Sequence, residues 1–312
     1  MSATFVVTKI LRLLLTVWAA ATLVFVMLRL AGDPVAAMVP SDAPQFVIDR
    51  YRERLGLDQP LVVQYLAYLW GLVGGDFGLS FRTGGPAWDI VAPRVVPTLI
   101  LTGSATLIAV FVGIPVGMVA AARRDTVIDR LVMSFSVLAF AMPNFFLGIL
   151  LILIFTLNLK LLPSGGFDHP VSLIMPALTL GLASAGAYAR LARSSMLEVL
   201  SSPFIRTARA NGIPTMRRLT HHVLRAILVP LVTLVGFSVG SMITGAVVTE
   251  TVFAWPGLGR LLVVSVAQRD LAVVQLIVIL AAAAMAFSNM IVDLLYGWLD
   301  PRIGSQRQKG GN

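Results

Sequence analysis

The sequence predicts an all-α membrane protein with six transmembrane helices and a helical loop between the first and the second. Hydrophobic residues make up 57% of the 312 residues, charged residues make up only 12%, and the mean hydropathy is +0.88. This composition excludes an ordinary soluble enzyme. Six stretches also lack any charged side chain, and most have the roughly 20 residues that a helix needs to cross a bilayer. They are residues 13–28, 98–122, 131–156, 171–189, 226–249 and 271–292.

The first apolar stretch is short, but Arg12 and Arg29 at its two ends can extend toward water. A basic segment before an apolar run, here with Lys9 and Arg12, is also typical of a signal peptide. Because no small-residue cleavage site follows, we interpret residues 1–30 as a cytoplasmic N-terminus and an uncleaved first helix.

The segment between the first two spans, residues 31–96, is the least apolar part of the chain and holds seven of the 15 acidic residues. Its pattern predicts a charged helix, a turn at residues 56–60, and an amphipathic helix with Tyr65, Tyr68 and Trp70. Aromatic residues of this kind favour headgroup depth, so we expect a helix pair on the outer membrane surface. The pair is either a cap that packs on the bundle or a surface for another protein.

Prolines and paired glycines mark the later spans. Single prolines are tolerated inside membrane helices, and we expect this at four positions: Pro115, Pro143, Pro176 and Pro230. Glycines four residues apart let helices approach closely in lipid, and two such pairs occur: Gly113 with Gly117, and Gly236 with Gly240. The sequence leaves open whether each pair faces its own bundle or a partner protein.

Lysine and arginine predict the orientation. With the N-terminus in the cytoplasm, 15 of the 24 basic residues fall in cytoplasmic segments, and several of the others lie in the body of the long loop, where charge has little influence. Both termini are therefore expected in the cytoplasm, together with residues 190–225.

The segment from residue 190 to 225 is the one long basic interruption in the apolar C-terminal part of the chain. Ser202-Pro203 is a typical helix start, and Asn211-Gly212 is a typical helix stop. The helix between them is too short to be stable alone and needs a surface to pack on. Four small residues would let another protein approach it closely, with Arg206 and Arg209 at the edge; they are Thr207, Ala208, Ala210 and Gly212. The alternative is a solvated loop.

Two acidic positions lie near the ends of predicted spans. Glu250 ends the fifth span and precedes a turn at Pro256-Gly257, so it is either a gate or docking contact or a solvated carboxylate at the interface. Asp293 lies near the cytoplasmic end of the sixth span, within reach of water or Arg302, and we favour a structural role.

Several chemistries are excluded, and no catalytic residue is assigned. Residues 236–240 match the Gly-x-Ser-x-Gly pattern of hydrolases, but the match lies inside a span and the three histidines lie in loops. We predict no metal site, because the chain has no cysteine and the adjacent His221 and His222 point apart on a helix. The basic residues do not share one face, which argues against nucleic acid as a partner.

The energy source is predicted from further absences. None of the three lysines follows a glycine, so the chain has no phosphate-binding loop of the Walker type. The six spans also lack ionisable residues near the bilayer centre, which disfavours an ion-coupled secondary carrier. We therefore favour a transport pathway that is driven by another protein, and the ion-coupled carrier remains the alternative.

The basic segment resembles the EAA loop of ABC importer permeases. Ala208, Gly212 and Leu224 match that signature, whereas Arg206 and Arg225 replace its glutamate and proline. These departures fit one branch, since FIRTARANG at residues 204–212 and HHVLRAILVP at 221–230 are similar to the permeases of dipeptide, oligopeptide and nickel importers. The similarity extends over nearly the whole chain.

The resemblance implies a type I ABC importer transmembrane fold in the bacterial inner membrane, with a core at residues 97–300 and a cytoplasmic tail at 301–312. It implies a second homologous permease, two ATP-binding subunits that hold ATP and Mg²⁺, and an extracytoplasmic substrate-binding protein that contacts the loop at 31–96. No cofactor is expected in this chain.

The resemblance also implies that residues 203–212 form a helix that docks on the ATPase, and that the turn after the fifth span lies near the mouth of the pathway. The docking residues would be Pro203, Arg206, Thr207, Ala208, Arg209, Gly212 and Leu224, and the mouth residues Glu250, Pro256 and Gly257. The cargo stays open among peptides, glutathione and nickel chelates.

Overall fold

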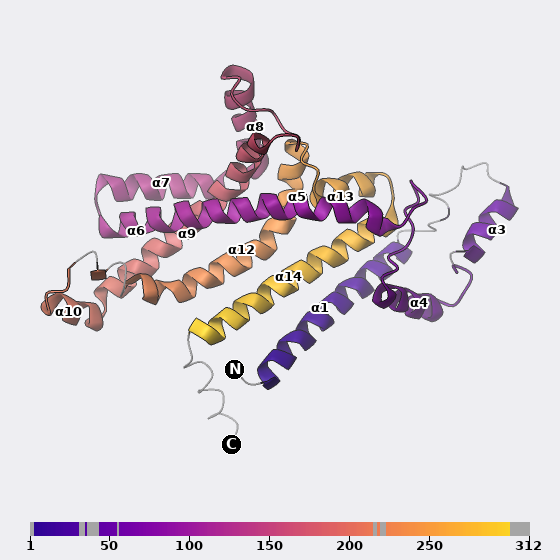
Figure 1. Cartoon of the computed structure of the whole chain (residues 1–312), viewed down its shortest axis with the longest axis horizontal. Coiled ribbons are helices and arrows are strands. Elements are labelled where there is room, and N and C mark those ends of the chain that lie inside the picture. The colour runs from indigo at the N-terminus through magenta and orange to yellow at the C-terminus, as the bar shows by residue number, and fades with distance from the viewer. Residues whose placement is uncertain are drawn as a thin grey trace.

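The computed structural model describes residues 3–30, 35, 44–54, 56–214, 217–218 and 223–299, and the regular elements in these ranges are helices. They are arranged along one long axis, with α10 (Pro203–Ala210) at one end and α3 (Gln45–Arg54) near the other (Figure 1). The predicted tail at 301–312, Arg302, and the pair His221 and His222 lie outside the described residues.

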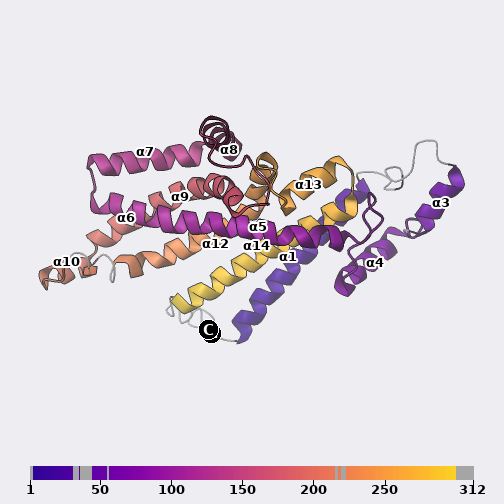
Figure 2. The same cartoon turned by 45° about the horizontal axis from the view of Figure 1, so that its top comes forward.

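The first and last helices, α1 (Ala3–Leu30) and α14 (Leu271–Leu299), pack against each other (Figure 2). The ammonium of Lys9 near the start of α1 forms a salt bridge with the Asp293 carboxylate near the end of α14. The two helices are therefore antiparallel. Asp293 has the structural role that we favoured, with Lys9 as its partner.

The predicted helix pair between the first two spans is present as α3 and α4 (Leu61–Gly74). The next helix differs from the prediction: α5 (Ala87–Ile108) begins ten residues before the expected core boundary at 97. It continues through a π-helical turn at Ala109–Gly113 into α6 (Ile114–Ala122). Pro93 and Pro97 lie inside α5 without ending it. The π turn ends two residues before Pro115, which cannot donate a helical hydrogen bond.

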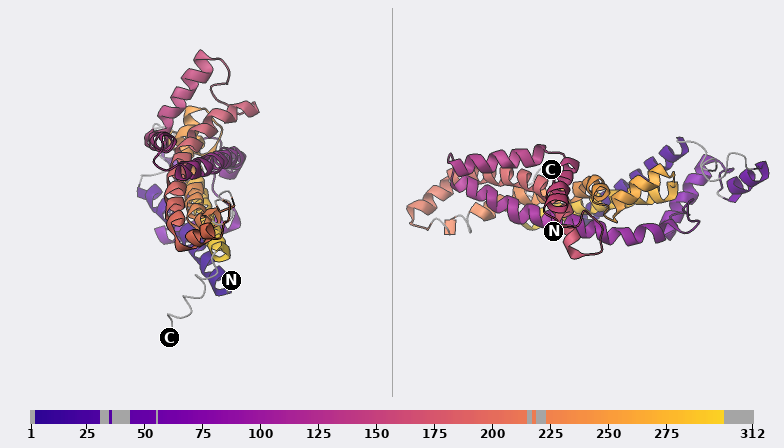
Figure 3. Two further views of the ribbon diagram at one scale, coloured as in Figure 1. Left: turned by 90° about the vertical axis from the view of Figure 1, so that its left-hand side faces the viewer. Right: turned by 90° about the horizontal axis from the view of Figure 1, so that it is seen from above.

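The third apolar stretch is not one continuous helix, because it is bent at Pro143. Here α7 (Val127–Ala141) and α8 (Asn144–Leu151, continued by a π turn at Ile152–Asn158) meet at 104°. Met142 has the extended backbone (φ −75°, ψ 124°) that a following proline favours. As a result α8 projects away from the bundle (Figure 3).

At the centre lies α9 (Ile174–Ser201), which follows a 3₁₀ turn at Pro170–Leu173 and packs on α5, α6, α7 and α12 (Leu224–Val252). It continues well past residue 189, where the charge-free stretch ends. A turn joins α12 to α13 (Leu258–Ala267), which precedes α14. By length and composition, four of the described helices are able to cross a membrane, or five if α7 and α8 form one span.

Both glycine pairs face helices of this chain. A Cβ added to Gly117 would lie 2.2 Å from the Ala189 carbonyl oxygen of α9, and one on Gly113 would lie 2.6 Å from that of Ala185. A Cβ on Gly236 would collide with Val292 of α14, at 1.6 Å. These glycines therefore allow close packing within the bundle.

Candidate functional site

The predicted docking helix at 203–212 is present as α10, which begins at the expected residue and ends at Ala210, before the expected stop at Asn211-Gly212. Ser202 occupies the N-cap position with Pro203 as the first helical residue, but its hydroxyl donates to the Val199 carbonyl rather than capping α10. At the other end Gly212 has φ +73°, and the amides of Gly212 and Ile213 donate to the carbonyls of Arg209 and Ala208. This is a Schellman motif, which satisfies the last carbonyls of the helix.

Two side chains hold α10 on the bundle. Ile205 is 5% exposed and Ala208 is 8% exposed, and Ile205 packs in a cluster with Met196 of α9 and Ile227 of α12. Ala208 therefore faces its own chain, and it does not contribute to an open surface of small residues as expected. Leu224 is half-buried at the edge of the same cluster, in α12 rather than α10.

The other face of α10 is exposed and carries most of the predicted docking residues. Arg206 donates to the Ser201 carbonyl at 3.1 Å, and Thr207 donates to the Pro203 carbonyl at 3.2 Å. The exposed positions include Pro203, Arg206, Thr207, Arg209 and Gly212. Phe204 is also exposed, but it is not among the docking residues predicted from the sequence. Neighbouring residues of a helix point in different directions, so an apolar residue beside the buried Ile205 is expected to face outward.

Glu250 is fully buried, at 0% exposure, and is neither a solvated carboxylate nor a surface contact in this structure. Thr98 of α5 donates to its Oε1 at 2.6 Å, and the Arg260 amide of α13 donates to its Oε2 at 2.9 Å. The same Thr98 hydroxyl accepts a hydrogen bond from the Leu258 amide at 2.8 Å. Glu250 and Thr98 together therefore join α12, α5 and the start of α13.

The turn between α12 and α13 is built around this carboxylate. A Cβ on Gly257 would lie 2.0 Å from Glu250 Oε1, so a side chain at 257 and the carboxylate cannot both be accommodated. Trp255 is also buried, and its indole N–H donates to the Pro97 carbonyl at 3.0 Å. Pro256 between them is half-buried. Glu250, Pro256 and Gly257 thus belong to one packed unit between the end of α12 and the start of α13, and Figure 1 shows α13 well apart from α10.

Two buried acidic residues elsewhere were missed. Asp129 of α7 pairs with Arg193 of α9, and Asp270 accepts hydrogen bonds from the Ser80 hydroxyl and the Phe81 amide. Thr126 caps α7, because its hydroxyl accepts a hydrogen bond from the Asp129 amide. This threonine is a sequence signal for the start of the helix, but it does not indicate which residue pairs with Asp129. Among the described residues, no group of three histidine, cysteine or acidic side chains is placed to hold a metal ion.

Comparisons with known proteins place the chain in a family. Residues 113–305 match the family model of the binding-protein-dependent transport system inner membrane component. The chain is 41% identical to the glutathione transport system permease protein GsiC of Escherichia coli K12, over 96% of this chain and 98% of that protein. It is 40% identical to GsiC of Shigella flexneri serotype 5b, with the same coverage.

A solved structure of the MetNI methionine ABC transporter in an inward-facing conformation is similar in fold, with a TM-score of 0.53 at 21% identity. The match covers 66% of this chain and 95% of the other. The chain thus belongs to the family of binding-protein-dependent transport system inner membrane components: it is a multi-pass inner-membrane permease subunit of an ABC importer, which works with binding-protein and ATPase partners and leaves ATP hydrolysis to the ATPase subunits.

Proposed function

We propose that this chain and a second, homologous permease together form the pathway of a type I importer that carries a small peptide such as glutathione. Two ATP-binding subunits complete the complex. The cargo is inferred from relatives named for glutathione transport, which match almost the whole chain at 41% identity. Six spans follow if the bent α7–α8 pair is the third and α12 is the fifth. The distribution of basic residues supports cytoplasmic termini.

The observation that carries this proposal is the attachment of α10. It is a short helix at one end of the molecule, it is held on the bundle by the buried Ile205 and Ala208, and its Arg206, Thr207 and Arg209 remain exposed. Because α10 follows directly on α9, a displacement of α10 by an ATPase subunit would be transmitted to the central helix of the bundle. In this way ATP hydrolysis in the partner subunits would change which side of the membrane the pathway faces.

At the other side of the membrane, the unit of Glu250, Pro256 and Gly257 is proposed to lie near the pathway mouth. Its burial supports a gate that moves as one packed piece with α5 and α13, rather than direct contact of the carboxylate with the binding protein. The helix pair α3–α4 within residues 31–96 would contact the binding protein. The core at 97–300 would then include the spans after the first, except for the first ten residues of α5.

The test is co-purification of the ATPase subunits with the permease, followed by binding-protein-stimulated ATPase activity in lipid. Arg209→Glu on α10 is expected to release the ATPase subunits and abolish the stimulation, because it inverts an exposed charge on the docking face. The matched control is Arg123→Glu, the same change at an exposed arginine just after α6.

If Arg209→Glu leaves the ATPase bound and fully stimulated, the assignment of α10 is wrong. Uptake into vesicles that follows a proton or sodium gradient without ATP would instead favour the ion-coupled carrier.

A further inference from the structure

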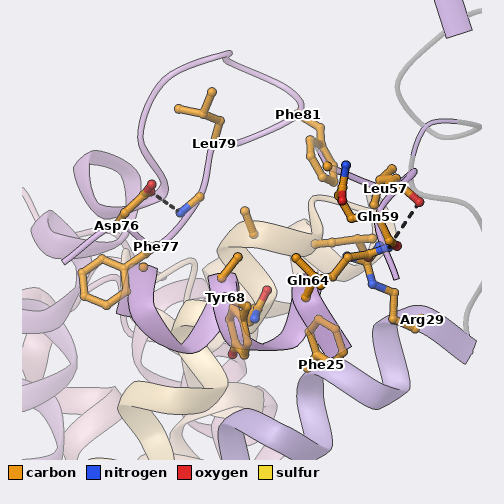
Figure 4. A pocket seen from close by; sticks show the side chains of 18 residues that line it. Phe25, Arg29, Leu57, Gln59, Gln64, Tyr68, Asp76, Phe77, Leu79 and Phe81 are labelled. Atoms are coloured by element: carbon orange, nitrogen blue, oxygen red, sulfur yellow. Dashed lines mark hydrogen bonds between the residues drawn. The ribbon is translucent and has the colours of Figure 1, made fainter. Parts of the chain in front are cut away.

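A cavity of about 570 Å³ lies between α1, α4 and the start of α14, and the loop after α4 closes one side. Aromatic and aliphatic side chains make up most of its lining, and the polar groups are few (Figure 4). This volume is in the range of small-molecule sites, which combine an apolar lining with a small number of placed polar groups. The cavity is separate from both α10 and the Glu250 unit.

Aromatic contacts hold α4 against α1, and two of these rings, Phe25 and Tyr68, line the cavity. The Phe25 ring stacks on Tyr68, with 5.4 Å between ring centroids, and meets Tyr65 edge-on at 5.3 Å. The Thr22 and Tyr65 hydroxyls are 2.6 Å apart and form a hydrogen bond. The cavity is therefore a built feature of the α1–α4 contact.

The ends of two candidate spans indicate that the cavity lies at the depth of lipid headgroups. The apolar span in α1 is Val6–Met27 and that in α14 begins at Leu271, so Phe25 and Leu271 in the lining stand at the ends of two spans. On its outer side α4 exposes Trp70 at 80% and Val73 at 83%. Such exposed apolar residues on a short helix beside two span ends are typical of a helix lying in the membrane interface.

The polar groups of the lining match a ligand that carries both charges. The Arg29 guanidinium, half-buried and 5.2 Å from the centre of the Phe25 ring, supplies a cation. Asp76, on the opposite side of the cavity in Figure 4, supplies a carboxylate.

A further polar group in the lining is the Gln64 side chain. Its amide nitrogen donates to the Gln59 carbonyl at 2.7 Å, whereas its Oε1 is buried without a hydrogen-bond partner among the described residues. An unpartnered buried acceptor is costly, so this oxygen favours a ligand with a hydrogen-bond donor.

We propose that this cavity binds the headgroup of an aminophospholipid of the phosphatidylethanolamine class, a role beyond the transport proposed above. The phosphate lies at Arg29, and the ammonium donates to Gln64 Oε1 and faces Asp76. The glycerol end contacts Phe25 and Leu271, and the acyl chains lie in the surrounding bilayer. A phosphatidylcholine headgroup lacks the N–H donor that Gln64 favours, and a phosphatidylglycerol headgroup lacks the cation that Asp76 favours.

The experiment uses the purified permease–ATPase complex in nanodiscs with phosphatidylethanolamine that carries a photoactivatable group in an acyl chain. Matched phosphatidylcholine and phosphatidylglycerol probes are run beside it, and the labelled peptides are mapped. Because the acyl chains leave the cavity at Phe25 and Leu271, labelling by the ethanolamine probe is expected on α1 and α14 near these two residues and is expected to exceed that by both other probes. Arg29→Gln is expected to reduce it about tenfold, the effect of losing a charge-assisted hydrogen bond.

Three further variants make the result specific. Gln64→Leu should abolish the preference for ethanolamine over choline, because it removes the acceptor. Ala67→Phe should block labelling by filling the cavity without a charge change, since Ala67 lines it and is exposed enough to be replaced without disturbing the core. Arg12→Gln, the same change at the other end of α1, should leave labelling unchanged.

Equal labelling by the three probes, stronger labelling by phosphatidylglycerol, or labelling unaffected by both Arg29→Gln and Ala67→Phe would overturn the proposal. Displacement of the lipid probe by a soluble dipeptide at millimolar concentration would also overturn it, and would indicate a peptide site instead.

Discussion

Arg193 of α9 binds Asp129 of α7 through two hydrogen bonds, from Nε to Oδ1 at 2.6 Å and from Nη2 to Oδ2 at 2.7 Å. Asp129 is only 3% exposed and also accepts from the Asp125 amide at 3.0 Å. Nearly one turn earlier in α9, the Arg190 guanidinium lies 4.4 Å from the centre of the Phe140 ring. These contacts join α7 to the helix that leads into α10.

Removing one partner of this ion pair leaves a buried charge uncompensated. We expect Arg193→Met to lower the free energy of unfolding by about 3–5 kcal/mol, whereas Arg193→Met combined with Asp129→Leu should restore most of the loss. Thermal denaturation of the purified complex measures both. A single variant as stable as the wild type would show that the pair contributes nothing to stability.

Thr98 joins Glu250 to the backbone of α13, so Thr98→Val should leave both the carboxylate and the Leu258 amide short of a partner. The expected loss is about 1–3 kcal/mol for each buried group left unsatisfied. Thr102→Val is the matched control, because the Thr102 hydroxyl is also buried on α5 but bonds only carbonyls of its own helix. Similar losses of thermal stability in the two variants would contradict the role given to Thr98.

Gly117→Ala should separate α6 from α9, because the added Cβ would lie 2.2 Å from a backbone oxygen of Ala189. Overpacking of this kind costs roughly 1–3 kcal/mol. Gly103→Ala on α5 is the control: no described atom lies within 4 Å of the added Cβ, and alanine is the better helix former. We expect the first change to lower the midpoint of thermal unfolding and the second to maintain or raise it.

The backbone of Gly212 distinguishes two roles for the end of α10. If its φ of +73° is what matters, Gly212→Asn should keep more of the stimulated ATPase activity than Gly212→Ala, since asparagine adopts this conformation more readily. If the lack of a side chain matters for ATPase docking, the larger asparagine should be the more harmful. ATPase assays with the binding protein separate the two.

Local features of the fold were predictable from sequence. Charge-free stretches located the four helices that are able to cross a membrane, and turn residues located the α3–α4 pair and the start and stop of α10. Proline was harder to interpret, because its effect depends on the backbone around it: Pro97 lies inside α5, whereas Pro143 ends α7.

Features of the site that depend on distant partners were not predictable. The partner of Asp129 is 64 residues away, and the burial of Glu250 depends on Thr98, 152 residues earlier. The Ala208 side chain is buried because of the place where α10 packs on α9 and α12. The alternation of small and charged residues within α10 does not determine that place.

The contact of Gly117 with the backbone of Ala189 limits how the permease can move. No side chain stands between α6 and α9 at this point, so no rotamer change can widen or narrow the gap between them. Packing this close favours movement of α6, α9 and α10 as one rigid unit. We therefore expect a change in access to the pathway to arise between this unit and its neighbours rather than within it.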